Sequence, residues 1–309
     1  MSYHVLHIFE QGVKLSKDRA FLVCKKDFKE FGRIAIEDLR AVVLLSEAVS
    51  LSASLIATLC DNDTIILHCK NFKPVGITAS LSRTYDALVV LNQSKQIKSL
   101  SDFLWAKLLR AKVENNIAVL KYIGAKYERL EGIFSNKRRA LNEAWAAREY
   151  WSEYFPSMGE YGQIRERDAD SSPTNLMLNY GYGVLGALVH RAIIIAGLNP
   201  LLGVNHKTYY KNTPLVYDLI EPYRACVDLL LYKYVGENGF SNIRAWAKFV
   251  GIHLREFRLR KGQGSVKLMD CIDFSARSLA NAYRKRSASE LWIPNLNDNL
   301  EMTLVKQRK

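Results

Sequence analysis

The chain has 309 residues, of which 49% are hydrophobic and 24% are charged. These fractions are typical of globular proteins and exclude a largely disordered chain, and the length suffices for one large domain or two ordinary ones. Five cysteines, an odd number without CxxC spacing, argue against a secreted disulfide scaffold and against a zinc ribbon.

The net charge of +13 is unevenly distributed along the chain. Residues 1–90 contain 11 basic and 10 acidic side chains, whereas residues 91–309 contain 33 and 21. A polyanionic partner should therefore contact the second part, and nucleic acid or an anionic membrane surface is the natural candidate. The N-terminus lacks the pattern of a signal peptide, and the longest apolar stretch, 182–204, is interrupted by charged and turn-forming residues. We expect a cytoplasmic protein without a membrane span.

Short β-type segments rich in Val, Ile, Leu and Phe dominate residues 3–80. The expected strands are 5–9, 20–24, 33–45, 64–68 and 75–78. The expected turns are at Gly12, Asp18, Asn62-Asp63 and Pro74. A helix is expected over 52–59, because Ser50 or Ser52 can cap its start and Asp61-Asn62 can close it.

After the polar stretch 91–95 the apolar spacing becomes helical. Ser101 is expected to cap a long helix, and Pro or Gly residues separate the later ones. Those later helices are expected at 138–155, 174–197, 214–234, 241–260 and 272–288. The predicted fold class is α+β, with a small N-terminal β-rich domain, residues 1–90, followed by a larger all-helical domain, residues 91–309.

The segment 142–151 carries the first candidate for chemistry. On a helix, Glu143, Ala147 and Tyr150 share one face at spacings of four and three. Alanines beside the carboxylate let a second helix approach closely, which would partly bury Glu143. The simpler interpretation is a solvated helix carboxylate, and this segment alone leaves both interpretations open.

The second candidate is His206, within Asn205-His206-Lys207 after the turn-rich segment 197–203. Imidazole is suited to metal ligation and to proton transfer near neutral pH. A single histidine in a loop is more often a surface residue, so the two interpretations stand side by side. The other histidines have no carboxylate pattern beside them and are interpreted as structural.

The third candidate is an acidic stripe formed by Asp218, Glu221 and Asp228. Positions 218, 221, 225 and 228 step by three and four, which places the carboxylates on one helical face. Like charges at this spacing destabilise a helix by ~0.2–0.5 kcal/mol per pair unless they share a cation. Pro222 predicts a kink or a new first turn. The shared cation is either a metal ion or the guanidinium of Arg224.

One histidine with two or three carboxylates favours Mg²⁺ or Mn²⁺ over a structural Zn²⁺ site, because hard divalent ions prefer oxygen ligands. A basic surface around an acidic metal pocket is typical of phosphoryl transfer on nucleic acid. The residue pattern therefore indicates a metal-dependent nucleic-acid enzyme.

Five segments stand in a fixed order along the chain: WAKLLRAKVENN at 105–116, NEAWAAREYW at 142–151, SPTNLMLNYGY at 172–182, AGLNP at 196–200 with Asn205-His206, and DLIEPYRACVD at 218–228. Together they resemble a known family, the CRISPR-associated integrases that insert new spacers and are the first-numbered of the Cas proteins. The resemblance covers nearly the whole chain. The short chain, and Glu rather than Asp at 221, resemble members of type II systems. Ala144 stands where many members have Gly, and Asn142 where Arg or a small residue is common.

This resemblance implies a site and a reaction. Glu143, His206 and Glu221 would be the catalytic residues and the ligands of one divalent ion, Mg²⁺ or Mn²⁺. Asp218, Arg224 and Asp228 would support them. The implied activity is that of an endonuclease/integrase in antiviral defence, in which a DNA 3′-OH attacks a phosphodiester of the CRISPR array.

The resemblance also implies partners. These are double-stranded DNA, a second copy of the chain in a homodimer formed by the β-rich domain, and a small dimeric CRISPR-associated protein that bridges two such dimers. The effector nuclease of a type II system is a further candidate, and no membrane partner is expected.

DNA should be contacted mainly through its phosphates, because new spacers have no fixed sequence. Arg244, Lys248, Gly251, Arg255 and Arg258 step by four and three and predict a basic helical stripe. The clusters Lys137-Arg138-Arg139 and Arg284-Lys285-Arg286 are similar candidates. An ordinary solvated helix face is the alternative for all of them.

Two other functions fit the same residues. A plain metal-dependent nuclease in DNA repair would use water as the nucleophile. A non-catalytic DNA-binding scaffold would pair the acidic stripe with Arg224 and nearby lysines. Joined DNA strands would indicate the integrase, and strands that are only shortened would indicate the nuclease. Activity and thermal stability that do not respond to Mn²⁺ would indicate the scaffold.

Overall fold

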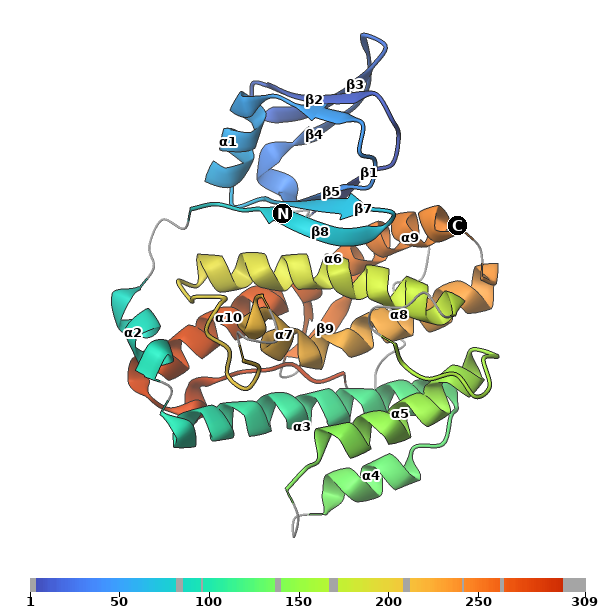
Figure 1. The fold of residues 1–309 in the computed structure, drawn as a ribbon, viewed down its shortest axis with the longest axis vertical. Coiled ribbons are helices and arrows are strands. Elements are labelled where there is room, and N and C mark those ends of the chain that lie inside the picture. The colour runs from blue at the N-terminus through green and yellow to red at the C-terminus, as the bar shows by residue number, and fades with distance from the viewer. Residues whose placement is uncertain are drawn as a thin grey trace.

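The computed structural model describes residues 4–81, 86–95, 97–136, 140–166, 172–207, 212–240, 242–261 and 264–296. Within these ranges a β-rich N-terminal region sits above a helical body, and the two share one continuous face of contact (Figure 1). The predicted basic cluster at 137–139 lies outside the described residues.

The N-terminal region consists of two four-stranded sheets and one helix. One sheet has the order β1-β5-β7-β8, in which β5 runs parallel to β1 and β7, and β8 is antiparallel to β7. The other has the order β4-β3-β2-β6. The bounds are β1 His4–Ile8, β2 Val13–Asp18, β3 Phe21–Lys26, β4 Lys29–Ala35, β5 Leu39–Leu44, β6 Val49–Leu51, α1 Ala53–Asp61, β7 Ile65–Lys70 and β8 Lys73–Thr78.

Several details of this region differ from the sequence-based expectation. The single strand expected over 33–45 is wrong, because a 3-10 turn at Ile36–Asp38 separates β4 and β5, which belong to different sheets. Pro74 is not a turn residue. It lies in β8, an edge strand where proline is tolerated, while Asn71 and Phe72 form the turn with positive φ. The capping of the first helix by Ser52 is confirmed, since its hydroxyl accepts from Leu55 N at 3.2 Å.

The helical body contains nine α-helices among the described residues, together with a short hairpin. The bounds are α2 Ala87–Lys95, α3 Lys98–Ile123, α4 Glu128–Ser135, α5 Glu143–Ser157, α6 Pro173–Ile195, α7 Pro214–Ile220, α8 Arg224–Asn238, α9 Ile243–Glu256, β9 Arg258–Lys261, β10 Gly264–Lys267 and α10 Leu268–Lys285. The 3-10 turns Glu221–Tyr223 and Ala288–Glu290 complete the list.

The expectation of an all-helical second part is therefore wrong. The helix expected over 241–260 ends at Glu256, and the chain continues as the β9–β10 hairpin. Phe257 and Leu259 are buried and prolong the apolar pattern past the true end of the helix, so periodicity alone could not detect the change. Ser101 is not a cap either, because α3 begins at Lys98 and Ile97 occupies the N-cap position.

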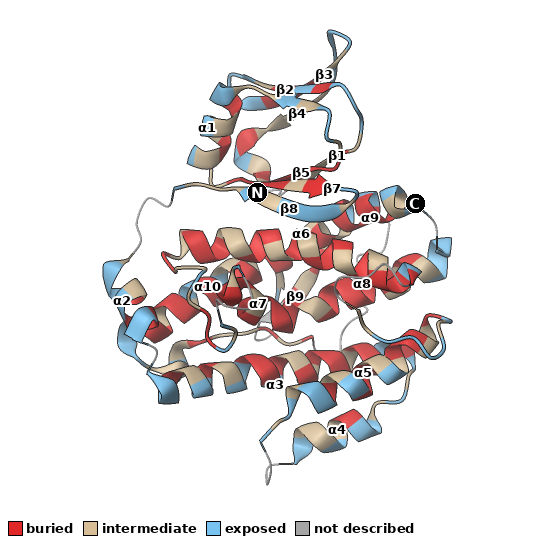
Figure 2. Cartoon of the chain, viewed as in Figure 1, coloured by how far each residue is buried: buried red, intermediate tan, exposed pale blue. Residues whose placement is uncertain are grey.

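Helix α6 forms the centre of the molecule, between the β1-β5-β7-β8 sheet and helices α7, α8 and α10 (Figure 1). By length and composition it could cross a membrane, but 67% of its most apolar window is buried inside the protein, as in a core helix. Buried residues are concentrated on α6, α7 and α8 and on one face of α3 (Figure 2). These packed elements position the polar residues described below.

Two glycines allow the β-rich region to dock closely on the helical body. Gly251 on α9 faces the ring of His7 on β1, and Gly183 on α6 faces the ring of Pro74 on β8. In both places a Cβ atom would collide with the facing ring. The close approach of α9 to β1 and of α6 to β8 thus requires glycine.

Replacing either glycine by alanine should loosen this docking. Gly251→Ala and Gly183→Ala should each lower the free energy of unfolding by about 1–3 kcal/mol, the usual cost of overpacking. Gly236→Ala is the matched control, because Gly236 is an exposed residue of α8 whose added Cβ meets nothing within 4 Å. That control should be neutral or stabilising by about 0.5–1 kcal/mol. Urea unfolding measures all three, and equal stabilities would contradict this account of the interface.

Candidate active site

A cavity of about 340 Å³ opens between α3, α5, α6, the loop before α7, and the α7–α8 junction. Its lining brings together the three residues predicted as ligands, Glu143, His206 and Glu221, from three separate segments. The other lining residues are Lys112, Asn116, Ala144, Ala147, Trp151, Arg165, Tyr182, Arg224 and Asp228. Polar and aromatic side chains from distant parts of the chain thus converge on one concave site.

Glu143 is the first residue of α5. Asn142 caps this helix, its Oδ1 accepting from Trp145 N at 2.9 Å, which fixes where the helix starts and hence the direction of the Glu143 side chain. The carboxylate accepts from Lys112 Nζ at 2.8 Å. Its side chain is 31% exposed, so of the two interpretations left open the partly buried one is correct, and the helix beside it is α3.

Glu221 lies at a break in the acidic segment. The chain forms a 3-10 turn over Glu221–Tyr223 between α7 and α8, and Pro222 is part of that turn, as predicted for this position. The Glu221 side chain is 1% exposed and pairs with Lys112 Nζ at 2.8 Å and with Arg224 Nη2 at 3.2 Å. The suggestion that Arg224 neutralises an acidic residue of this segment is therefore confirmed for Glu221.

Asp218 holds the loop that carries His206. Its buried carboxylate accepts from the backbone N–H groups of Val204 at 2.6 Å, Asn205 at 3.1 Å and His206 at 3.1 Å. It also bonds His206 Nδ1 at 2.7 Å. A proton on Nδ1 directed at the carboxylate leaves Nε2 as the acceptor of the neutral ring. Asp218 is thus a positioning residue for the histidine.

Asp228 lines the same cavity as Glu221, and its carboxylate is held by a group of tyrosines. Tyr150 donates to its Oδ2 at 2.7 Å, and Tyr182 donates to Oδ1. Tyr154 donates to its backbone carbonyl at 2.8 Å. Burial raises the pKa of Asp228 to about 6, although the hydrogen bonds from Tyr182 and Tyr150 oppose that shift.

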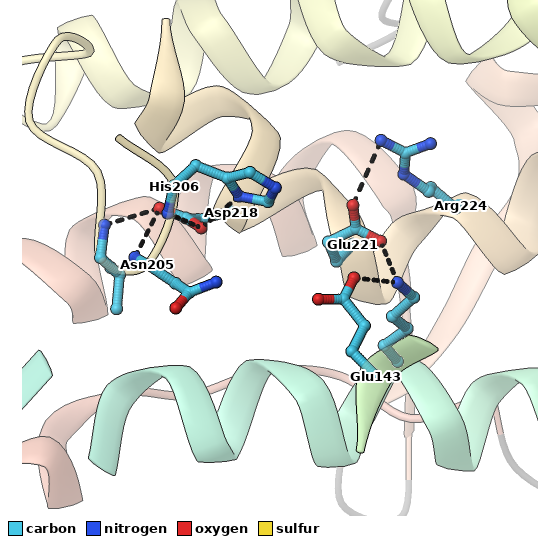
Figure 3. A network of polar contacts seen from close by, with 8 residues as sticks. Glu143, Asn205, His206, Asp218, Glu221 and Arg224 are labelled. Atoms are coloured by element: carbon cyan, nitrogen blue, oxygen red, sulfur yellow. Dashed lines mark hydrogen bonds and ion pairs between the residues drawn. The ribbon is translucent and has the colours of Figure 1, made fainter. Parts of the chain in front are cut away.

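The expectation of three carboxylates on one helical face is therefore wrong. The 3-10 turn at Glu221 interrupts the helix, and Asp218 is directed at the 204–206 loop. Glu221 and Asp228 both line the cavity, but Glu221 pairs with cations and Asp228 accepts hydrogen bonds from tyrosines. Among the described residues no three His, Cys, Asp or Glu side chains are grouped closely enough to hold an ion. In Figure 3 His206 and Asp218 form one group of contacts, and Glu143 and Glu221 form a second group that is separate from it in this view.

The chemistry of the donors nevertheless fits a divalent cation. Glu143 and Glu221 already converge on a positive charge, since Lys112 Nζ lies 2.8 Å from an oxygen of each. Carboxylate oxygens with one imidazole nitrogen suit Mg²⁺ or Mn²⁺. The candidate holders of such an ion are Glu143, Glu221 and His206 Nε2.

Sequence reasoning missed several residues of the cavity. Lys112 lies in the segment 105–116 that resembles the family, but the sequence analysis gave it no function. Its spacing of four residues from Asn116 puts both side chains on one face of a helix, and this spacing could have identified it. The guanidinium of Arg165 lies over the rings of Trp151 and Tyr182, with centroid distances of 5.7 and 5.3 Å. No local pattern pointed to Arg165, because it precedes α6 in an irregular segment.

The predicted basic stripe on α9 is only partly a free surface. Arg244 and Lys248 are exposed. Arg255 instead contacts His4 Nδ1 at 3.0 Å and Glu256 at 2.6 Å, beside the contact of Gly251 with β1. Arg258 lies in β9, so the helical stripe cannot extend to it, and that part of the prediction is wrong.

The other basic cluster, Arg284 to Arg286, lies at the end of α10. All three side chains are exposed, and each has an acidic or polar partner in the protein. These are Asp86 for Arg284, Glu290 for Lys285 and Asn92 for Arg286. Residues 137–139 lie outside the described residues, and DNA contact by any of these residues stays a prediction.

Comparison with known sequences gives one consistent result. The family model of CRISPR associated protein Cas1 matches residues 6–242. The CRISPR-associated endonuclease Cas1 of Neisseria meningitidis serogroup C is 28% identical over 229 residues, covering 72% of this chain and 73% of the relative. A CRISPR-associated endonuclease Cas1 of Francisella tularensis subsp. novicida is 30% identical over 243 residues, covering 72% and 76%.

Solved structures share the fold at low sequence identity. A casposase bound to integration product has a TM-score of 0.77 at 18% identity and covers 93% of this chain and 92% of its own. A CAS1 protein from Thermotoga maritima has a TM-score of 0.76 at 16% identity and covers 90% and 96%. A Cas6-RT-Cas1–Cas2 complex has a TM-score of 0.72 at 18% identity and covers 96% of this chain and 36% of that one. The predicted succession of a β-rich region and a mainly helical region is confirmed.

The raised pKa of Asp228 has a consequence for stability. An unfolded aspartate titrates near pH 4, so between about pH 4 and 6 the folded protein binds the extra proton. The contribution of Asp228 to the free energy of unfolding should therefore fall as pH rises through this window, by up to about 3 kcal/mol, and stay low above it.

Urea unfolding at pH 5, 6 and 7 checks this in wild type and in Asp228→Asn. The wild type should lose stability relative to the variant as pH rises from 5 to 7. Asp102→Asn, at an exposed position on α3, controls for removing any one carboxylate. Parallel pH profiles of wild type and Asp228→Asn would contradict the expected proton uptake.

Proposed function

Because this chain belongs to the CRISPR associated protein Cas1 family, we propose that it is a metal-dependent DNA endonuclease/integrase that inserts short DNA fragments into a CRISPR array. The observation that carries the proposal is the convergence of Glu143, Glu221 and His206 on one cavity in the basic part of the chain. The names of the relatives, CRISPR-associated endonuclease Cas1, support a nuclease, and the casposase neighbour supports strand joining.

The proposed cofactor is Mg²⁺ or Mn²⁺, held by the carboxylates of Glu143 and Glu221 and by Nε2 of His206. When bound, such an ion supplies Lewis-acid polarisation of a phosphoryl oxygen. Asp218 would keep the histidine in the tautomer that offers Nε2, through its bond to Nδ1. Arg224, whose side chain is 14% exposed and pairs with Glu221, would fix the orientation of that carboxylate.

The proposed reaction is a transesterification in which a 3′-OH of the incoming DNA attacks an array phosphodiester in line with the leaving oxygen. The attacking hydroxyl loses its proton as its oxygen bonds to the phosphorus, and the bond between that phosphorus and the 3′-oxygen of the array strand breaks. The leaving oxygen takes up a proton and becomes a free 3′-OH. Preorganised positive charge around the phosphate lowers the barrier most, because charge accumulates on its oxygens. Among the cavity residues, Arg165 would provide such charge together with the bound ion, because Lys112 and Arg224 are already paired with carboxylates.

The proposed partners are double-stranded DNA, a second copy of the chain, and a small dimeric Cas2-type protein. The structural neighbour that is a Cas1–Cas2 assembly supports the last of these. We propose that two homodimers are bridged by one partner dimer, that the effector nuclease of a type II system takes part, and that the reaction takes place in the cytoplasm.

Removing any of the three central residues should abolish strand transfer while leaving the fold intact. Glu143→Ala, His206→Ala and Glu221→Ala are tested for joining labelled short duplexes to a supercoiled array plasmid, with Mg²⁺ or Mn²⁺ and with the Cas2-type partner. We expect losses of about 100-fold or more, as for other groups that act directly at a reacting centre. Glu131→Ala is the control, since Glu131 on α4 forms an exposed ion pair with Lys121 on α3.

The products distinguish this function from its alternatives. Label joined to the plasmid, and lost with EDTA and in the three variants, supports the integrase. Metal-dependent shortening without joining in the presence of the partner would instead indicate a plain nuclease of DNA repair. Absence of any metal-dependent product would leave a DNA-binding scaffold, and full activity of one variant would remove that residue from the site.

DNA affinity should depend strongly on salt. Phosphate contacts release counterions, so each contact adds roughly 0.9 to the slope of log affinity against log salt for duplex DNA. Arg244→Ala with Lys248→Ala, both exposed on α9, should weaken binding of unrelated duplexes equally and reduce the slope by about 2. An unchanged slope, measured by fluorescence anisotropy between low and high salt, would exclude these two residues from the DNA surface.

A further inference from the structure

Lys112 holds a position in the cavity that no other lysine of the described residues shares. Its Nζ lies 2.8 Å from Glu143 Oε1 and 2.8 Å from Glu221 Oε2, so one ammonium joins the two carboxylates. The exposed fractions of the side chains are 11% for Lys112, 31% for Glu143 and 1% for Glu221. The interaction is therefore shielded from bulk water on the Glu221 side, where electrostatic attraction is strongest.

The charges of the paired side chains in the cavity add up to zero. Glu221 also pairs with Arg224 Nη2 at 3.2 Å, so two carboxylates face two cations. Breaking a buried pair by removing one partner leaves an uncompensated charge, which is strongly unfavourable. Conversely, a divalent cation that enters this balanced group adds two positive charges beside Lys112 and must displace or repel its ammonium.

We propose that Lys112 is a built-in competitor of the divalent ion: its ammonium bridges Glu143 and Glu221 when the ion is absent and sets the ion concentration at which the site fills. This inference rests on the proposed function and deepens it. A bridging Lys112 accounts for two observations. Two carboxylates predicted as metal ligands pair with the same ammonium, and among the described residues no three potential ligands are grouped closely enough to hold an ion.

The side chain of Lys112 is suited to leaving this position. A lysine ammonium is a compact point charge on a flexible stem of four carbons, and it forms no fixed bidentate geometry with a carboxylate. Lys112 lines the cavity of about 340 Å³, which leaves room for its ammonium beside the carboxylates. Lys112 is thus a positioning residue that acts through Glu143 and Glu221.

The test is direct Mn²⁺ binding, measured by isothermal calorimetry on the full chain without DNA. Lys112→Gln should bind Mn²⁺ at least about tenfold more tightly than wild type, because a competing positive charge is removed. In EDTA the variant should have a lower Tm than wild type, and saturating Mn²⁺ should raise its Tm by more than it raises that of wild type. Lys121→Gln, which breaks the exposed pair of the same helix with Glu131, should match wild type in Mn²⁺ affinity.

A second variant covers the case in which Lys112→Gln fails to fold. Lys112→Arg keeps the charge and can bond carboxylates in a bidentate manner, so it should bind Mn²⁺ no more tightly than wild type. Unchanged or weaker binding by Lys112→Gln, or tighter binding by Lys112→Arg, would overturn the role of Lys112 while leaving the metal-dependent function in place. Absence of Mn²⁺ binding in wild type and in all variants would instead overturn the metal site of the proposed function and this inference with it.

Discussion

The break between α7 and α8 is the constraint on which the polar site depends. Proline at 222 has no N–H to continue the ladder of α7, and the chain passes through a 3-10 turn before α8 begins. The amide of Asn115 on α3 donates to the Pro222 carbonyl at 2.7 Å and ties the turn to that helix. Lys112 lies one turn earlier on α3, so a single helix both fixes the turn and supplies the cation that faces Glu221.

Removing a carboxylate from water costs free energy, and three buried acids in and beside the cavity offset this cost through different partners. Asp218 receives three backbone N–H groups and a histidine, which commits both of its oxygens to holding a loop. Asp228 receives two tyrosine hydroxyls and has a raised pKa. Glu221 faces cations carried on side chains, and a cation can be exchanged for another cation without rebuilding the backbone. The hydrogen-bond and ion-pair partners therefore distinguish two kinds of acid. Asp218 and Asp228 stabilise the structure of the site, whereas Glu221 is available to bind a cation.

The sequence was sufficient for features that depend on local patterns and insufficient for those that depend on distant contacts. The Ser52 cap follows from local residues. The helix expected from residue 138 instead starts at Glu143, after the Asn142 cap, so its start was predicted five residues too early. The β9–β10 hairpin was missed, because buried apolar residues after α9 continue a helical spacing. The meeting of Glu143, His206 and Glu221 needed the family resemblance, since they lie in separate segments. The environment of Asp228 is set by tyrosines of two other helices and had no local signature.

The balanced charges inside the cavity contrast with the surplus of positive charge in the part of the chain that contains it. Residues 91–309 have 33 basic and 21 acidic side chains, whereas the pairs around Glu221 contribute no net charge. The long-range field that attracts a polyanion must therefore originate outside the cavity. Within the cavity, the positive charges of Lys112 and Arg224 repel a divalent ion and lower its affinity. Added negative charge would reduce this repulsion. A DNA phosphate is such a charge, so binding of DNA and filling of the metal site should favour each other by linkage.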